Sequence, residues 1–314
     1  MGHYCVIGGT RFFGSLLVRR LLDAGHAVTL VNRGRAGDDF GDSVERLTAD
    51  ANDPAALADA VAGRSFDAVV HQVCYHPRAA IAAAEAFGDR AGRFVLTSSM
   101  EVYNRDTFRW KVAAPDFDAR AREDQLDPDG YGYDTSLDWE SMEFLEPNYG
   151  EGKRQAEAAL TDRAEVPVVV ARVAHVLAEE GDFTGRMDFH VRRLAGGEPV
   201  VAHREPGRTS LVHADDVAAF LEWAATAENA SGVYNACAPD LAGVYDVARA
   251  LEKASGRTAE VLELDDAQGD ERLSGYSCPA DFGLSSDKAA TDGFPFRPVA
   301  EWLPALAEHA WRER

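Results

Sequence analysis

The chain has 314 residues, of which 46% are hydrophobic, and this is enough to form one large α/β domain with a smaller lobe. Its 53 acidic and 32 basic residues give a net charge of −21, which favours solubility and argues against binding nucleic acid. The sequence has neither an apolar run near the roughly 20 residues of a membrane span nor a signal peptide, so we expect a cytoplasmic protein without a membrane partner.

The first 34 residues predict a strand–helix–strand unit. A short apolar strand at residues 3–7 is followed by a glycine turn, an amphipathic helix at 15–24 and a second strand at 27–31. The same alternation continues, with strands expected at 46–48, 68–71, 94–97 and 166–170 and helices at 54–61 and 79–87. Alternating strands and helices predict a doubly wound parallel sheet, the Rossmann-type α/β architecture, with a smaller C-terminal lobe.

The glycine turn lies between the first strand and the first helix, where a dinucleotide would bind. Glycines let the backbone approach a pyrophosphate, which then sits on the amide groups at the start of the helix. Arg11 stands where many such turns have a third glycine, and the alternative is a tight turn that binds no ligand. The residues expected to contact a cofactor in this turn are Gly8, Gly9, Thr10, Arg11, Phe12, Phe13 and Gly14.

The end of the second strand favours NADP over NAD. An acidic residue at this point would bind the adenosine ribose and reject a 2′-phosphate. The chain instead has Asn32, Arg33 and Arg35, and guanidinium groups bind phosphate in bidentate fashion. NADP is therefore the favoured cofactor, and NAD is the alternative if these arginines are solvated.

Tyr149 and Lys153, four residues apart, form the candidate catalytic pair. On a helix these two positions share a face, and a nearby ammonium lowers the pKa of a phenol, which suits the phenol to acid/base work. Ser99 follows an apolar strand, at the edge of a parallel sheet where ligands bind. The alternative is that Ser98 and Ser99 only satisfy backbone groups at the end of the strand.

These motifs and several others occur in the order of one known family. They are Gly-Gly-Thr-Arg-Phe-Phe-Gly at residues 8–14, Asp50, Val70-His71, Ser98-Ser99-x-x-Val102-Tyr103, Tyr149-x-x-x-Lys153, Arg172, Val-His-Ala-Asp-Asp-Val at 212–217 and Ser-Asp-Lys-Ala at 286–289. The chain resembles the extended short-chain dehydrogenases/reductases, the NAD-dependent epimerase/dehydratase group. Its glycine turn is most similar to the branch that includes chloroplast stem-loop RNA-binding proteins.

The resemblance implies a role for each matching residue. Ser99 would hold the substrate oxygen, Tyr149 would exchange the hydroxyl proton while hydride moves to or from the nicotinamide, and Lys153 would bind the nicotinamide ribose. The cofactor would also be lined by Asp50, Ala51, Gln72, Val73 and Cys74. The helix that carries Tyr149 and Lys153 commonly pairs with its copy in this family, so the resemblance implies a homodimer.

Departures from the family pattern bear on the substrate. Met100-Glu101 stands where sugar-nucleotide dehydratases have an aspartate–glutamate pair, and methionine cannot move a proton, which argues against dehydration. Glu101 is then either a lone acid/base or a structural residue. The other weak candidates for substrate binding are His175, Arg192 and Arg208, with Arg193 and Arg204 as further sources of positive charge.

The spacing of 50 residues between Ser99 and Tyr149 is about twice the usual gap in the family. The insertion, residues 104–148, contains Trp110, Tyr131, Tyr133 and Trp139, and aromatic residues can close over a ligand as a lid. The alternative is a surface excursion that packs against a neighbouring subunit. We expect a cofactor domain at 1–171, to which 210–238 returns, and a substrate lobe built from 172–209 and 239–314.

Three functions follow from these expectations. The first is an NAD(P)-dependent oxidoreductase or epimerase that acts on a hydroxyl or ketone of a sugar-nucleotide-like or other small polar substrate. The second is an NADPH-dependent ketone reductase of a biosynthetic pathway. The third is an RNA-binding protein on the same fold, which the complete catalytic set and the acidic charge argue against. The four cysteines have no zinc-like spacing, so no metal site is expected.

Overall fold

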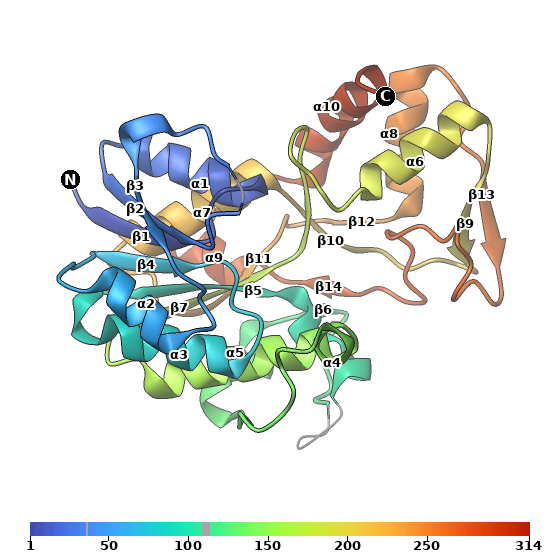
Figure 1. Cartoon of the computed structure of the whole chain (residues 1–314). Coiled ribbons are helices and arrows are strands. Elements are labelled where there is room, and N and C mark those ends of the chain that lie inside the picture. Colours follow the sequence, from blue (N-terminus) through green and yellow to red (C-terminus); the bar gives the residue numbers. More distant parts are fainter. Residues whose placement is uncertain (36, 109–113) are drawn as a thin grey trace.

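The computed structural model describes residues 1–35, 37–108 and 114–314, and at its centre is a seven-stranded parallel sheet (Figure 1). The strand order is β11-β7-β5-β4-β1-β2-β3. The strands are β1 (His3–Ile7), β2 (Ala27–Asn32), β3 (Glu45–Thr48), β4 (Ala68–His71), β5 (Phe94–Ser99), β7 (Val168–Val173) and β11 (Gly232–Ala236). Helices cover both faces, which confirms the predicted doubly wound α/β fold.

All strands of the large sheet except the edge strand β3 contribute side chains to two apolar cores, one on each face of the sheet. In β1, Val6 belongs to one core, and Cys5 and Ile7 belong to the other. Successive side chains of a strand point to opposite faces, and burial on both faces explains the nearly continuous apolar runs in the sequence. One layer of helices is α1 (Phe12–Asp23) and α7 (Ala214–Thr226), and the other is α2 (Pro54–Val61), α3 (Pro77–Phe87) and α5 (Tyr149–Arg163).

The expected elements are present, some with shifted ends. The strands at 3–7 and 68–71 and the helix at 54–61 have the predicted bounds. The strand expected at 94–97 runs on to Ser99, and the one expected at 166–170 is Val168–Val173. The reason is their mutual register, in which Phe94 pairs with Val168 and Ser99 with Val173, so that each strand extends the other.

The smaller lobe has its own sheets, helices and apolar core. A three-stranded sheet contains β8 (His175–Leu177), β10 (Thr209–His213) and β12 (Leu241–Ala242), and β9 (Val200–His203) pairs with β13 (Val261–Leu264). The core of the lobe is filled by side chains from three helices, α6 (Arg186–Gly196), α8 (Val244–Ser255) and α10 (Val299–Arg312). Within the described part of the chain, no helix has the length and apolar character needed to cross a membrane.

The chain returns to the large sheet at two places rather than one. Helix α7 and strand β11, both within residues 210–238, belong to the large domain, whereas β10 belongs to the smaller sheet. The second return was not expected. Helix α9 (Asp287–Thr291) packs against β11, and the rings of Phe294 and Phe296 lie 5.3 and 5.4 Å from that of Phe220 in α7. Part of the segment 239–314 therefore completes the core of the cofactor domain.

The insertion packs against its own chain. Its described residues include β6 (Arg120–Ala121), which pairs with β14 (Gly283–Leu284), and the short helix α4 (Met142–Leu145). Trp139 is fully buried, whereas Trp110 lies outside the described residues. Hydrogen bonds join Thr135 to α3 and join Tyr131 and Asp134 to α5. The lid and the packing against a neighbouring subunit both stay predictions.

Candidate active site

The carboxyl edge of the large sheet brings Ser99 and Tyr149 together. Ser99 ends β5, and its Oγ accepts a hydrogen bond of 3.2 Å from the backbone N–H of Glu101. Tyr149 is the first residue of α5, and its half-buried phenol is hydrogen-bonded to Ser99. The hydroxyl of Ser98 instead donates to the carboxylate of Glu157. This geometry favours Ser99 over Ser98 as the serine that would contact a substrate.

Lys153 lies one helical turn after Tyr149 and is almost fully buried. Its Nζ donates to the carbonyl oxygens of Cys74 and Thr97 at 2.8 and 2.9 Å. The same atom lies 4.7 Å from the ring centre of Tyr75 and 5.7 Å from that of Tyr149. Burial lowers the pKa of Lys153, and Tyr75 and Cys74 oppose this effect. Two carbonyls and two aromatic rings thus fix the ammonium group beside the phenol.

The pKa of Tyr149 differs from the expectation from sequence. Burial raises this pKa to about 12, although the hydrogen bond from Ser99 lowers it. The charge of Glu101 raises it further, and the charge of Arg186 lowers it. The expected depression of the pKa by Lys153 is therefore corrected, because burial of the phenol has the larger effect. At neutral pH the phenol of Tyr149 carries its proton.

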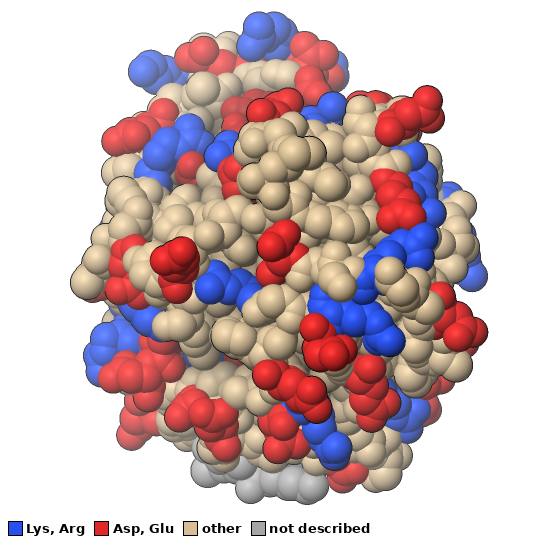
Figure 2. All heavy atoms as spheres, turned by 90° about the vertical axis from the view of Figure 1, so that its left-hand side faces the viewer, with Lys and Arg blue, Asp and Glu red and all other residues tan. Residues whose placement is uncertain are grey.

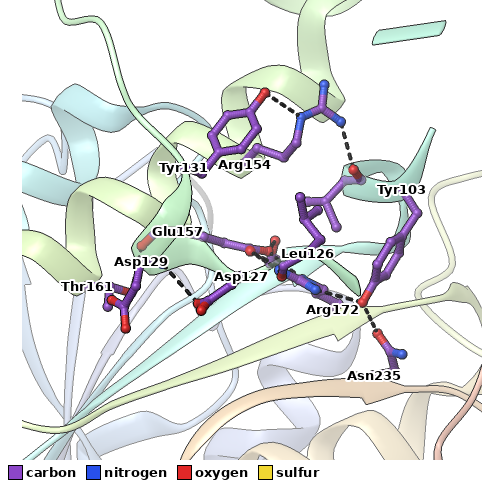
Figure 3. A network of polar contacts seen from close by, with 12 residues as sticks. Tyr103, Leu126, Asp127, Asp129, Tyr131, Arg154, Glu157, Thr161, Arg172 and Asn235 are labelled. Carbon is purple, nitrogen blue, oxygen red and sulfur yellow. Dashed lines mark hydrogen bonds and ion pairs between the residues drawn. The ribbon is translucent and has the colours of Figure 1, made fainter. Parts of the chain in front are cut away.

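A buried network of polar side chains connects helix α5 with the large sheet and the insertion (Figure 3). The guanidinium group of Arg172 on β7 and the carboxylate of Glu157 on α5 are 2.7 Å apart, and both side chains are inaccessible to solvent. Arg172 also donates to the hydroxyl of Tyr103 at 2.6 Å and to the carbonyl of Leu126 at 2.8 Å. The Tyr103 hydroxyl donates to Asn235 on β11 at 3.0 Å. Arg172 therefore joins the sheet, the catalytic helix and the insertion.

The glycine turn forms a cradle that a side chain would fill. A Cβ atom on Gly14 would clash with the amide of Gln72 and lie 3.0 Å from the Gly9 Cα. Helix α1 follows with no side-chain cap and no acid in its first turn, so its amide groups are available to an anion. The Nε2 of Gln72 is buried and has no partner among the described residues, and Val73 lies against Gly8. These features fit the pyrophosphate of a dinucleotide.

The region after β2 contains both basic and acidic side chains. Arg33 and Arg35 are exposed, and the Asn32 Oδ1 accepts the Gly34 N–H at 2.7 Å. A cavity of about 600 Å³ beside the glycine turn is lined by Thr10, Arg11, Phe12, Ser15, Arg19, Gly37, Asp38, Asp39, Gly181 and Phe183. Sequence reasoning missed Asp38 and Asp39, because they come several residues after the end of β2. Both nevertheless lie beside the glycine turn. Their charges are offset by ion pairs with Arg46 and Arg19.

Asp50 and Ala51, both expected to contact the cofactor, follow β3 after Ala49. The carboxylate of Asp50 accepts the backbone N–H of Asn52 at 3.0 Å, which closes a turn at this edge of the sheet. Strand β3 pairs with β2, with Thr48 opposite Asn32. Both ends thus lie on the side of the sheet where the glycine turn begins.

Arg186, the first residue of α6, is a site residue that sequence reasoning missed. Its charge lowers the pKa of Tyr149. Burial lowers the pKa of His175 to about 3, and the charge of Arg186 acts in the same direction. Glu101 borders the same region, where its Oε2 accepts a hydrogen bond of 2.9 Å from Asn104. A substrate beside Tyr149 would therefore meet a neutral imidazole, a guanidinium group and a carboxylate.

The other candidate arginines are engaged within the smaller lobe. Arg208 lies 3.9 Å from the carboxylate of Asp281, and Arg193 and Arg204 each form an ion pair with an acidic neighbour. Arg192 lines a separate cavity of about 410 Å³ beside α10. Among the residues that the structure describes, no group of three or more histidine, cysteine or acidic side chains could hold a metal ion.

Buried histidines predict that the fold is sensitive to acid. Burial lowers the pKa of His71 to about 3 and those of His76 and His190 to about 4, whereas an unfolded chain titrates near 6.5. Below about pH 6.5 the unfolded state binds protons that the folded state does not, so the free energy of unfolding falls with pH. We expect a fall of about 2–4 kcal/mol between about pH 7.5 and 5.5, measured by urea denaturation.

A variant of one of these histidines provides the control. With His175, four histidines have a pKa that burial lowers. His190→Gln removes one of these four groups, and its fall in free energy should be about a quarter smaller. Equal unfolding free energies of the unsubstituted chain at the two pH values would contradict the prediction.

The fold and the cradle define a dinucleotide-binding α/β protein. Residues 8–180 match the NAD(P)H-binding family, and the chain belongs to this family. It is 25% identical over 332 aligned residues to an anthocyanidin reductase of Vitis vinifera, covering 93% of this chain and 90% of the reductase.

Two solved structures show the same fold. The enzyme WbmG of Bordetella bronchiseptica in complex with NAD has a TM-score of 0.73, 17% identity and coverage of 99% of this chain and 94% of its own. The UDP-glucose 4-epimerase of Thermus thermophilus in complex with NAD has a TM-score of 0.68, 19% identity and coverage of 98% of both chains. Together with the family match, they confirm the resemblance to extended short-chain dehydrogenases/reductases.

Proposed function

We propose that the chain is an NAD(P)-dependent oxidoreductase that acts on a hydroxyl or ketone of a small polar substrate, with Ser99, Tyr149 and Lys153 as its catalytic residues. The observation that carries this proposal is their convergence at the sheet edge that also holds the glycine cradle. The bound dinucleotide would supply or accept the hydride. The chain itself would position the substrate oxygen and move its proton.

The protonated phenol of Tyr149 suits it to donate a proton to a carbonyl oxygen as that oxygen gains charge. The hydroxyl of Ser99, which is hydrogen-bonded to this phenol, would hold the same oxygen. Lys153, whose Nζ is fixed by two backbone carbonyls, would bind the nicotinamide ribose beside Tyr149. Proton donation from a positioned group contributes typically about 10²–10⁴-fold to a rate.

Different observations favour the two forms of this chemistry. Net reduction with NADPH is favoured by the exposed guanidinium groups of Arg33 and Arg35 and by the similarity to an anthocyanidin reductase. Epimerisation of a sugar-nucleotide-like substrate is favoured by the fold shared with a UDP-glucose 4-epimerase. We place reduction first, because Arg33 and Arg35 are residues of this chain, whereas epimerisation is favoured only by a shared fold.

The surface argues against the third function, RNA binding. On the face shown in Figure 2, acidic side chains lie beside the basic ones. The chain has a net charge of −21. Binding of nucleic acid depends on neutralising its phosphates with basic side chains.

The proposal is tested by the cofactor itself. The purified protein is denatured and any released dinucleotide is identified, after which refolded or cofactor-free protein is titrated with NADPH and NADH. We expect tighter binding of NADPH, and we expect Arg33→Ala to lose about 10–100-fold in NADPH affinity with little change for NADH. Arg249→Ala, an exposed arginine on α8, is the control and should change neither affinity.

Other outcomes discriminate between the two forms. Tightly retained NAD or NADH, without a preference for NADPH, would favour the epimerase and reject Arg33 as a 2′-phosphate site. Failure to bind either dinucleotide would reject the proposal as a whole.

A further inference from the structure

Helix α5, which carries Tyr149 and Lys153, is buried on all sides although it lies in an outer layer of the fold. Every residue from Gly150 to Leu160 is buried, including Glu151, Arg154 and Gln155. A helix that covers one face of a sheet normally keeps a polar face in water. Something therefore covers the face of α5 that points away from the sheet.

The covering element is residues 127–146, which we call the strap. The Tyr131 hydroxyl in the strap donates to the Glu151 carboxylate at 2.7 Å, and the Asp134 N–H donates to the Gln155 side chain at 2.7 Å. The Gln155 amide donates in turn to Glu151 at 2.8 Å. The polar groups on this face of α5 thus find their partners within the same chain.

Trp139 anchors the strap between α3 and α5. Its side chain is fully buried, and its Nε1 donates to the Asp134 carbonyl at 2.8 Å. A Cβ atom on Gly152 would lie 3.3 Å from the Trp139 ring, so the ring packs directly on the backbone of α5. The rings of His76 and Phe144 lie 6.5 and 5.4 Å from it. Glycine at position 152 permits this close packing.

Two arginine side chains, Arg78 and Arg154, form hydrogen bonds that connect the strap and the turn after Ser99 to helices α3 and α5. Arg78 on α3 donates to the carbonyl oxygens of Thr135 at 2.7 Å and Leu137 at 3.1 Å. Arg154 on α5, buried beside Tyr131 (Figure 3), pairs with Glu151 and donates to the Val102 carbonyl at 2.7 Å. Arg154 therefore ties the catalytic helix to the turn that follows Ser99.

The resemblance to the family implied a homodimer paired through this helix, whereas in this structure the strap of the same chain contacts the outer face of the helix. We propose that the strap closes the outer face of α3 and α5 in cis, so that no second copy packs on the catalytic helix and one chain alone holds Tyr149 and Lys153 in place. A second copy could reach α5 only by expelling Trp139 and by separating Glu151 and Gln155 from their partners in the strap.

The proposal is tested with a cysteine introduced in place of Ala158, which is 3% exposed. Positions 151, 155, 158 and 162 follow helical spacing, and three of them contact residues 131–134, so position 158 lies under the strap. Ala158→Cys protein is labelled with a maleimide at about 1 and 100 μM protein, and the label is located by peptide mass spectrometry, which separates it from the native cysteines. Light scattering gives the mass at both concentrations.

We expect a mass of 34.0 kDa and slow labelling of the introduced cysteine at the same rate at both concentrations. The protein could also form a dimer whose dissociation leaves the labelling rate of the introduced cysteine unchanged. Such a dimer would use a surface other than α5 and would also support the proposal. Labelling that becomes at least tenfold faster as a dimer dissociates would overturn the proposal, because a second copy would then be the cover.

Two variants in the strap give a further test. Trp139→Ala in the Ala158→Cys background should make labelling at least tenfold faster, because the strap loses its anchor. Met142→Ala, at a side chain in the same segment that is 67% exposed, should leave the labelling rate unchanged. If Trp139→Ala fails to fold, the labelling rates of Ala158→Cys at the two protein concentrations still test the proposal.

Discussion

Replacing Tyr149 with phenylalanine is expected to lower turnover by about 10²–10⁴-fold, because the substrate oxygen loses its proton donor. The loss corresponds to about 3–5 kcal/mol of transition-state stabilisation. The ring of Tyr149 also lies 5.7 Å from the ammonium of Lys153, and phenylalanine keeps that contact. We therefore expect the dissociation constant for NADPH to stay within about threefold of that of the unsubstituted enzyme.

The measurement is steady-state turnover on a substrate found by screening ketones, keto sugars and nucleotide sugars, together with a fluorescence titration of NADPH. Tyr245→Phe is the matched control. Tyr245 is a partly exposed phenol on α8 that donates to Glu263 at 2.6 Å, and its loss should leave turnover unchanged. Turnover of Tyr149→Phe within threefold of the unsubstituted enzyme would reject Tyr149 as the acid/base.

The sequence was sufficient to predict the parts of this site that depend on local spacing. Ser99 was proposed because it lies at the end of an apolar strand and matches the family pattern, and Tyr149 and Lys153 were proposed because positions four apart share one face of a helix. The glycine turn was found because a strand, a turn and a helix occur in the required order. Each of these signals lies within about ten consecutive residues, where the period of a strand or a helix fixes the geometry.

The parts that were missed arise from contacts between distant segments. Arg186 reaches the region of Tyr149 only because the smaller lobe packs beside the sheet edge, and nothing in its local sequence marks it. The depression of the Tyr149 pKa was expected from its distance to Lys153, whereas burial, which depends on the whole fold, has the larger effect. The NADP assignment considered only the residues next to β2 and overlooked Asp38 and Asp39.

The strap was unpredictable for a different reason. It has little helix or strand period, and its turns are held by side-chain hydrogen bonds to nearby backbone groups, such as those of Asp127 with the Asp129 N–H and of Asp134 with the Ser136 N–H. Such turns are compatible with many directions of the chain. The direction taken here depends on where Trp139 finds a pocket, and that pocket consists of residues from α3 and α5.

Arg172→Met is expected to destabilise the fold by about 3–5 kcal/mol, because it leaves the Glu157 carboxylate buried without its cation. Both side chains are almost completely excluded from solvent, so water cannot replace the missing partner. The same substitution removes the donors to Tyr103 and to the Leu126 carbonyl. Since a domain of this kind is stable by only about 5–15 kcal/mol, the variant should show a clear loss in urea denaturation and a lower Tm.

The double variant Arg172→Met/Glu157→Leu tests the cause of that loss. An apolar pair of similar size can replace a buried ion pair at little cost, so the double variant should be more stable than Arg172→Met alone. It should remain about 1–3 kcal/mol less stable than the unsubstituted chain, because Ser98 and the Leu126 carbonyl lose their partners. Arg204→Met breaks an exposed ion pair with Asp265, which solvent screens, and should leave the free energy of unfolding nearly unchanged. If the double variant were as unstable as Arg172→Met, the lost hydrogen bonds rather than the unpaired carboxylate of Glu157 would account for the destabilisation.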